Sequence, residues 1–378
     1  MDTLPQAIPR LHQIDALRGV AVLMILFANI FAFGYPFEVS ELAGLSESMS
    51  LWSQLQHQLY ELLIRGKFIS LLTLLFGASL YLLWQQSQMS ADKLKARMSA
   101  LLLIGFCHAV FVWSGDVLLM YALVASGLLW QQVLHWAPEH QLRYAKNYLL
   151  AGLVLPALVW LLPSGQAEDP ADTAKLVALY TGTYSDQLWH QMKYVALVVL
   201  DLLFISYWWF GGMMLLAIWA MQSDWQQLLK HHFVTLLLIA FGCGLLPMLW
   251  TGFTFADHGL HPLHMISDLC FALIYIRLFM FVMPLFPVVF ELLRRCGRCS
   301  LSLYLWQSVT MVLLFRWVCP QWFATLDRGS LTAIAVAFIL LQLLCVQYFY
   351  KTSQLWWFEQ LYRWLSVKLE RRAHDTAL

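Results

Sequence analysis

The segment Val20–Phe37, VAVLMILFANIFAFGYPF, decides the class of protein to which this chain belongs. It carries no charged residue, and Asn29 is its only amide. A helix of about 20 apolar residues spans the hydrocarbon core of a bilayer, which is about 30 Å thick. The segment therefore predicts a transmembrane helix, and the same pattern recurs along the chain.

About ten stretches of this kind predict an all-α polytopic membrane protein. Residues 1–350 form a single transmembrane helical domain in this interpretation, and residues 351–378 form a cytoplasmic amphipathic, interfacial helix and tail. The predicted spans are Val20–Phe37, Lys67–Trp84, Met98–Trp113, Val117–Gln132, Asn147–Leu162, Tyr194–Met221, Phe233–Trp250, Met265–Phe290, Ser300–Phe315 and Leu331–Tyr350. The sixth is long enough to be one extended helix or a span broken at Gly211-Gly212.

The composition supports a membrane protein and excludes several other classes. Hydrophobic residues make up 61% of the chain and charged residues 12%, whereas soluble domains contain about 45–50% and 25%. A soluble enzyme and a disordered protein are excluded, and a net charge of +1 argues against a nucleic-acid partner. Membrane lipids are the expected surroundings, and self-association into a homo-oligomer is left open.

Lysine and arginine residues are unevenly divided between alternate segments. Sixteen of the 23 fall on the side that holds both termini, and six fall on the other. Since cytoplasmic loops are enriched in these residues, both termini are predicted to be cytoplasmic. No cleavage site follows the first span, so that span is expected to remain as a signal anchor.

Two patterns of metal-ligand residue types are weak. The first consists of His258, His261, His264 and Asp268, and the second of the pair Cys296 and Cys299. Neither has the supporting residues that metal sites require, and the seven dispersed cysteines do not resemble a disulfide framework. No metal site and no bound cofactor are predicted.

Ionisable and amide groups inside the spans are the functional candidates, because such groups are costly in a bilayer unless they are paired. Asp15 and Arg18 share one face at the start of the first span, where Arg18 either binds an anion or forms a local salt bridge. Asn29 lies near the bilayer midplane, where amides also bond between helices. Lys67 begins the second span.

His108 and Asp116 are the candidates for chemistry. They flank the turn between the third and fourth spans, eight residues apart. Asp116 either holds His108 as a general base or simply caps the fourth span.

Arg277 is the only cation in the middle of a span. Asp268 is nine residues away, about 13 Å along a helix, and is too far to pair with it. Arg277 is therefore expected to pair with Asp201 or to bind an anion.

Several short motifs resemble the YeiB-like family of bacterial membrane proteins. They are Asp15-Ala-Leu-Arg18-Gly19-Val-Ala, Phe27-Ala-Asn29-Ile, Lys67-Phe68 with Leu74-Leu-Phe-Gly77, Gly105-Phe-Cys-His108, Gly115-Asp116-Val-Leu-Leu-Met-Tyr121-Ala and Gly211-Gly-Met-Met-Leu. This resemblance implies a protein of the bacterial inner membrane.

More distantly, Asp15-x-x-Arg18-Gly19 followed by Asn29 is similar to the opening of the transmembrane acyltransferase superfamily, which includes the heparan glucosaminide acetyltransferase and polysaccharide O-acyltransferases. The similarity implies acyl-CoA as a cytoplasmic donor and an acceptor from the other side. In the heparan enzyme a catalytic histidine closely follows the first span, but residues 35–50 of this chain contain none. His108 would have to supply the base.

Two functions follow from these residues. In acyl transfer, Arg18 and Lys67 hold the anionic donor or the developing charge, and Asn29 orients the acyl group. His108 with Asp116 deprotonates an acceptor hydroxyl or amine. In transport or lipid-like ligand binding, His108, Asp116 and Arg277 line a path for a small solute.

Overall fold

The computed structural model describes residues 12–42, 51–86, 89–160, 170–250, 262–349 and 356–375. Within these ranges every regular element is a helix, which confirms the predicted all-α polytopic class. The α-helices are α1 (His12–Gly34), α2 (Leu51–Leu63), α3 (Lys67–Trp84), α4 (Ala91–Phe111), α5 (Leu118–Trp130), α6 (Pro138–Trp160), α7 (Pro170–Tyr180), α8 (Tyr184–Asp201), α9 (Tyr207–Ala220), α10 (Trp225–His231), α11 (Phe233–Trp250), α12 (Pro262–Val282), α13 (Pro287–Arg298), α14 (Ser300–Leu313), α15 (Arg328–Phe349) and α16 (Trp357–Asp375). Shorter turns connect them: η1 (Phe37–Leu42), η2 (Val133–His135), η4 (Met283–Leu285) and η6 (Pro320–Trp322) are 3₁₀-helical, and η3 (Leu202–Ser206) and η5 (Leu314–Val318) are π-helical.

Seven helical segments in the described ranges are long and apolar enough to cross a membrane, fewer than the ten spans predicted. They are His12–Gly34, Gln54–Trp84, Ala91–Phe111, Tyr184–Ala220, Pro262–Leu285, Ser300–Val318 and Arg328–Phe349. An eighth is added if α10 and α11, which meet at a bend of 66°, form one broken span.

The difference has a physical reason at each remaining predicted span. The predicted span Val117–Gln132 corresponds to α5, whose 13 residues reach only about 20 Å at 1.5 Å per residue. The predicted span Asn147–Leu162 falls on the second half of α6, whose first half is polar. The predicted span Phe233–Trp250 corresponds to α11, which is counted only if the bent pair of α10 and α11 is one span. The predicted span Met265–Phe290 is among the seven but is too long, because Pro284 and Pro287 begin new helical segments after α12.

The predicted span Tyr194–Met221 belongs to one continuous helical segment, Tyr184–Ala220. Its irregularity is the π-helical turn η3, not a break at Gly211-Gly212. Both glycines are buried in α9, and a Cβ on Gly212 would lie 2.8 Å from the backbone nitrogen of Leu149 in α6. These glycines therefore permit close packing of α9 on α6 and leave the helix unbroken.

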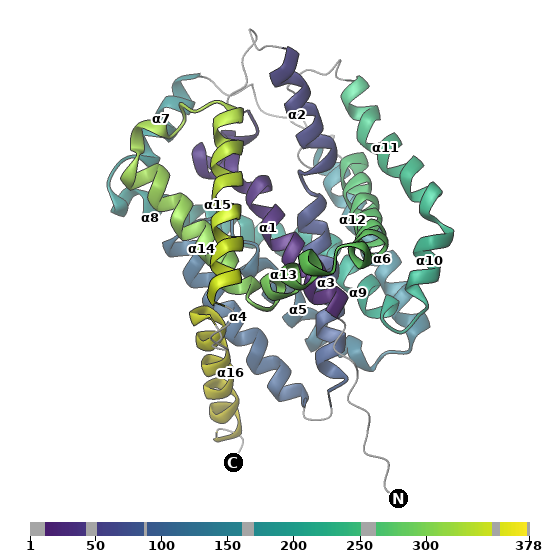
Figure 1. Ribbon diagram of the computed structural model, residues 1–378. Helices are drawn as coiled ribbons and strands as arrows, with labels where there is room; N and C mark the ends of the chain where they lie inside the picture. Colours follow the sequence, from purple (N-terminus) through teal and green to yellow (C-terminus); the bar gives the residue numbers. More distant parts are fainter. Residues whose placement is uncertain are drawn as a thin grey trace, which may run out of the picture.

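Helix α1 occupies the middle of the bundle and packs against α3, α13, α14 and α15 (Figure 1). Its crossing with α13 is very close. A Cβ on Gly19 would lie 2.0 Å from the carbonyl oxygen of Leu293, and a Cβ on Gly297 would lie 1.7 Å from that of Asp15. The approach expected at Gly19 is therefore made by the backbone of α13.

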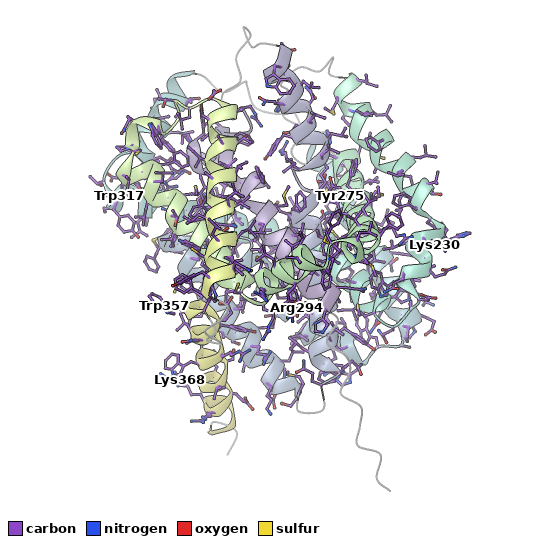
Figure 2. The ribbon with its side chains drawn as sticks, viewed as in Figure 1. Lys230, Tyr275, Arg294, Trp317, Trp357 and Lys368 are labelled. Carbon is purple, nitrogen blue, oxygen red and sulfur yellow. The ribbon has the colours of Figure 1, made fainter. Side chains whose placement is uncertain are left out.

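The two ends of the described chain lie toward the same end of the bundle. There α1 begins and α16 extends beyond α15, while α2 and the start of α15 lie at the opposite end (Figure 1). Helix α16 packs against α4 and α14, and Glu359 accepts hydrogen bonds from the amide and the hydroxyl of Ser302. Trp357 and Trp364 remain exposed on its other face, and Figure 2 shows Trp357 where α16 begins. The predicted amphipathic helix is present, but one of its faces packs against protein.

Candidate functional site

His108 and Asp116 form a buried pair between the end of α4 and the start of α5. The Nδ1 atom of His108 lies 2.8 Å from Oδ1 of Asp116. Their side chains are 3% and 0% exposed. A tight turn between α4 and α5 brings the two side chains together. The helices approach closely here, since a Cβ on Gly105 would lie only 2.6 Å from the amide nitrogen of Leu119. Gly105 thus allows α4 and α5 to pack closely beside the pair.

Asp116 has two further partners. Its Oδ2 accepts a hydrogen bond of 2.6 Å from the amide of Leu119, as an N-terminal helix cap does. Its Oδ1 also accepts a hydrogen bond of 3.0 Å from the hydroxyl of Tyr304 in α14. The pairing with His108 and the capping of α5, which the sequence left as alternatives, therefore occur together.

The second ring nitrogen of His108, Nε2, does not take part in the contact with Asp116. Nε2 is buried and has no hydrogen-bond partner within the part of the chain that the structure describes. A carboxylate at Nδ1 favours the tautomer with the proton on Nδ1, which leaves a lone pair on Nε2. This arrangement is that of a histidine oriented to accept a proton at Nε2.

Tyr304 is the member of this site that the sequence did not reveal. It lies 188 residues after Asp116, and its ring centroid is 5.4 Å from that of His108. Its hydroxyl also accepts a hydrogen bond of 3.3 Å from the amide of Val117. No local motif marks a tyrosine in an apolar span as a partner of a distant carboxylate, so only the tertiary structure identifies it.

Lys67 forms an ion pair that was not anticipated. Its Nζ lies 2.7 Å from Oδ1 of Asp268 in α12 and donates a hydrogen bond of 2.6 Å to the carbonyl oxygen of Glu61. The Lys67 side chain is only 1% exposed. Its ammonium group is thus occupied by protein atoms, which argues for a structural role.

Arg18 and Asp15 form the local salt bridge that the sequence allowed. The guanidinium Nη1 of Arg18 lies 3.2 Å from Oδ1 of Asp15, and Nη2 donates to the hydroxyl of Ser79 in α3. The Arg18 side chain remains 26% exposed. Asn29 is half-buried in α1, and its side-chain amide forms no hydrogen bond with a described residue.

Of the two alternatives predicted for Arg277, the pairing with Asp201 is wrong, and the binding of an anion stays a prediction. The structure shows no ion pair between them, and Asp201 instead accepts a hydrogen bond of 2.5 Å from the hydroxyl of Ser206. Arg277 is half-buried in α12, five residues before that helix ends at Val282. A long arginine side chain at this depth can extend its charged group toward the membrane surface, so a carboxylate partner is not required.

The two weak metal patterns gain no support. His258 and His261 lie outside the described residues, and no group of three or more ligand-type side chains with metal-site geometry occurs among the residues described. Cys296 and Cys299 are free thiols buried where α13 meets α14. Burial raises the pKa of the Cys296 thiol to about 12, which disfavours the thiolate that metal or redox chemistry needs.

These features define an all-helical polytopic membrane protein with a buried histidine–aspartate pair. Residues 217–368 match a family model described as "Protein of unknown function (DUF418)". The chain is 30% identical over 232 residues to the uncharacterized protein YeiB of Escherichia coli K12, a match that covers 58% of each chain. It is 31% identical over 155 residues to the uncharacterized protein YxaH of Bacillus subtilis 168, covering 37% of this chain and 39% of that protein. No solved structure gives a significant match.

The predicted resemblance to the YeiB-like family is therefore confirmed. The chain spans less than two thirds of the length of either relative. The DUF418 match begins after His108 and Asp116, so it includes Tyr304 but neither member of the pair.

Proposed function

We propose that this protein transfers an acyl group within the membrane, with His108 as the general base. The observation that carries the proposal is the buried His108–Asp116 pair, whose Nδ1 contact leaves Nε2 without a partner among the described residues. In the reaction, Nε2 would remove the proton from an acceptor hydroxyl or amine, whose oxygen or nitrogen would attack the thioester carbonyl of the donor. The C–S bond would then break, and the imidazolium, stabilised by Asp116, would return its proton to the departing CoA thiolate. The acyl donor would be an acyl-CoA.

The orientation belongs to the same proposal. We place the protein in a bacterial inner membrane with the start of α1 and helix α16 on the cytoplasmic side, because that side carries most of the lysine and arginine residues. Arg18 lies at this end and is partly exposed, so it is the residue best placed to meet the phosphates of a cytoplasmic donor. Lys67 has no such role, since its ammonium group is occupied.

Transport of a small solute is the second candidate function. It is favoured by the burial of the candidate residues, which are closed off from solvent. Neither His108 nor Lys67 is more than 4% exposed, so a ligand would reach either residue only after helices move. Such movement is the basis of alternating access, in which buried ionisable groups change partners.

Substitution of His108 by asparagine separates these roles. The asparagine amide can still donate to Asp116 in place of Nδ1–H, but it provides no base at the position of Nε2. The full chain, reconstituted in lipid vesicles, should release CoA from labelled acyl-CoA and pass the label to an acceptor. His108→Asn should reduce turnover by about 10²–10⁴-fold, while His140→Asn, the same change at an exposed histidine, should not.

The outcomes distinguish the two candidates. Loss of turnover with unchanged donor affinity and thermal stability supports acyl transfer. Absence of any CoA release by the native protein across several chain lengths and acceptors contradicts it. Solute counterflow that depends on His108, without a covalent product, would then identify a carrier.

A further inference from the structure

A second cluster of buried polar groups lies between α7, α8 and the π-helical turn η5. These groups line a narrow, partly open crevice that has no room for a water-sized sphere. The side chains around this space are Leu179, Tyr180, Gln187, His190, Gln191 and Arg316. None of them was a functional candidate from the sequence.

Arg316 is the central residue of this cluster. It is 5% exposed, and its Nε is buried without a hydrogen-bond partner. In the described part of the chain its guanidinium forms no ion pair and no hydrogen bond, and it lies over the ring of Tyr180, 4.7 Å from the ring centroid. A buried cation without a carboxylate partner is costly, and a cation–π contact offsets only about 0.5–2 kcal/mol of that cost.

The nearest carboxylate is already used. Oε1 of Glu38 lies 2.7 Å from Nε2 of His190, and Oε2 accepts a hydrogen bond of 3.3 Å from the hydroxyl of Tyr180. Glu38 therefore contributes to the charge balance of the cluster but forms no ion pair with Arg316. The guanidinium retains its capacity for a bidentate contact with an oxyanion.

Two glutamines on α8 add acceptors to the same space. Gln187 and Gln191 are four residues apart, hence on one face of the helix, and are 3% and 1% exposed. Both Oε1 atoms are buried without a donor among the described residues, although Nε2 of Gln187 donates to the carbonyl of Gly182. A cluster that offers one free cation and two free acceptors complements a ligand with an oxyanion and with hydroxyl or amine donors.

We propose that Arg316, Gln187 and Gln191 form a binding site for a small molecule that carries a phosphate or carboxylate group together with hydroxyl or amine donors. The oxyanion binds the guanidinium of Arg316, and the donors bind the two glutamine oxygens. Because the space is narrow without a ligand, Arg316 moves off the ring of Tyr180 when the ligand enters. The site lies toward the end of the bundle opposite α16, near Trp317, which Figure 2 shows on the outer surface. This proposal does not depend on acyl transfer.

Thermal unfolding of the full chain in phosphate-free maltoside micelles tests the site. The probes are inorganic phosphate, glycerol phosphate and glucuronate, each titrated over a wide range. At least one should raise the Tm of the native protein with saturation, since a ligand that binds the folded state stabilises it. Arg316→Met should weaken that response by about tenfold or more, because it removes the charge that holds the oxyanion.

The Tm of Arg316→Met without any ligand gives a second test. The substitution should raise the Tm, because it replaces a buried charge that has no ion-pair partner among the described residues by an apolar side chain of similar length. A purely structural arginine would give the opposite sign. The matched control is Lys193→Met, which removes an exposed cation from the same helix as Gln191 and should change neither quantity. Gln191→Leu is a second, independent variant that keeps the charge of Arg316. It should also weaken the rise in Tm caused by the probe, so the test does not depend on whether Arg316→Met folds.

A lipid source of the oxyanion is distinguished by a second arm. If phosphatidylglycerol added to the micelles raises the Tm and the soluble probes do not, the ligand is a lipid headgroup, and Arg316→Met should remove that response as well. The proposal is overturned if no probe and no lipid gives a saturable response in the native protein. It is also overturned if Arg316→Met responds as the native protein does.

Discussion

The structure contains two buried pairs of a basic side chain and an aspartate, and they differ in whether the basic side chain has hydrogen-bonding capacity left over. Lys67 with Asp268 and His108 with Asp116 have similar separations, 2.7 and 2.8 Å, and neither basic side chain is more than 3% exposed. The ammonium of Lys67 has a second acceptor in the carbonyl of Glu61. The ring of His108 has no second partner among the described residues.

The difference shows how a structural pair can be told from a chemical one. Burying a charge is tolerated when its hydrogen-bonding capacity is satisfied, and such a pair fixes helices relative to each other. A histidine held at one nitrogen keeps the other for proton transfer. The pair distances and the burial of the two basic side chains are alike, so the donors and acceptors that remain on those side chains are what separates them.

The largest effect on stability is expected from Lys67→Met. This change leaves Asp268 without its cation and should lower the free energy of unfolding by about 3 kcal/mol. The double variant Lys67→Met/Asp268→Leu should recover most of the loss, because it removes both charges. Denaturant-induced unfolding in micelles measures both effects, and a single variant as stable as the native protein would show that the pair is not structural.

Gly66→Ala should disturb the same pair sterically. Gly66 has φ of +75°, and a Cβ there would lie 1.9 Å from Oδ2 of Asp268. The strained backbone and the displaced carboxylate together should cost about 1–3 kcal/mol. Gly242→Ala in α11 is the control, since a Cβ there meets nothing within 4 Å, and it should be neutral or slightly stabilising. Equal Tm values for the two alanine variants would contradict the expected crowding.

Tyr304→Phe tests the third member of the His108 site. It removes one of the hydrogen bonds to Asp116 and should cost about 1 kcal/mol of stability. If acyl transfer occurs, turnover should fall, but less than in His108→Asn, because the base itself remains. Tyr348→Phe, at a tyrosine that is 75% exposed, serves as the control in both assays. A loss of turnover as large as that of His108→Asn would assign the chemistry to the tyrosine hydroxyl.

The smallest expected effect on stability comes from Glu359. Unlike Asp268 and Asp116, this buried carboxylate is paired with no basic side chain among the described residues and accepts hydrogen bonds from the neutral amide and hydroxyl of Ser302. Burial raises its pKa above the ordinary value of 4.5. The folded state therefore binds the proton more tightly, so the stability that this adds is present below pH 4.5 and is lost as the pH rises through the raised pKa.

Hydrogen exchange of the α16 amides should accordingly show weaker protection as the pH rises above about 4.5, after correction for the intrinsic exchange rate. Glu359→Gln should remove this dependence, because the amide does not titrate. Glu370→Gln, on the same helix, should leave it unchanged. A pH dependence that persists in Glu359→Gln would place its origin in another group.

Several features of the site were predictable because they depend on residues close in sequence. His108 and Asp116 lie eight residues apart across a tight turn, and Arg18 and Asp15 lie three apart on one helix, so local geometry nearly imposes both contacts. The Asp268 partner of Lys67 and the absence of an ion pair between Arg277 and Asp201 were not predictable, because a contact with another helix depends on how the helices pack. Lys67 meets Asp268 across 201 positions, whereas Asp201 is not a partner of Arg277.

The sequence by itself determined the membrane class and the all-α fold. Long apolar segments have no other stable environment, and a backbone in lipid must satisfy its hydrogen bonds within helices. It could not determine how many of those segments are long enough to span, since α5 ends at Trp130, after only 13 helical residues. The tertiary structure alone placed Tyr304 on Asp116 and gathered Arg316, Gln187 and Gln191 around one space, because contacts between distant helices are set by packing and leave no local pattern in the chain.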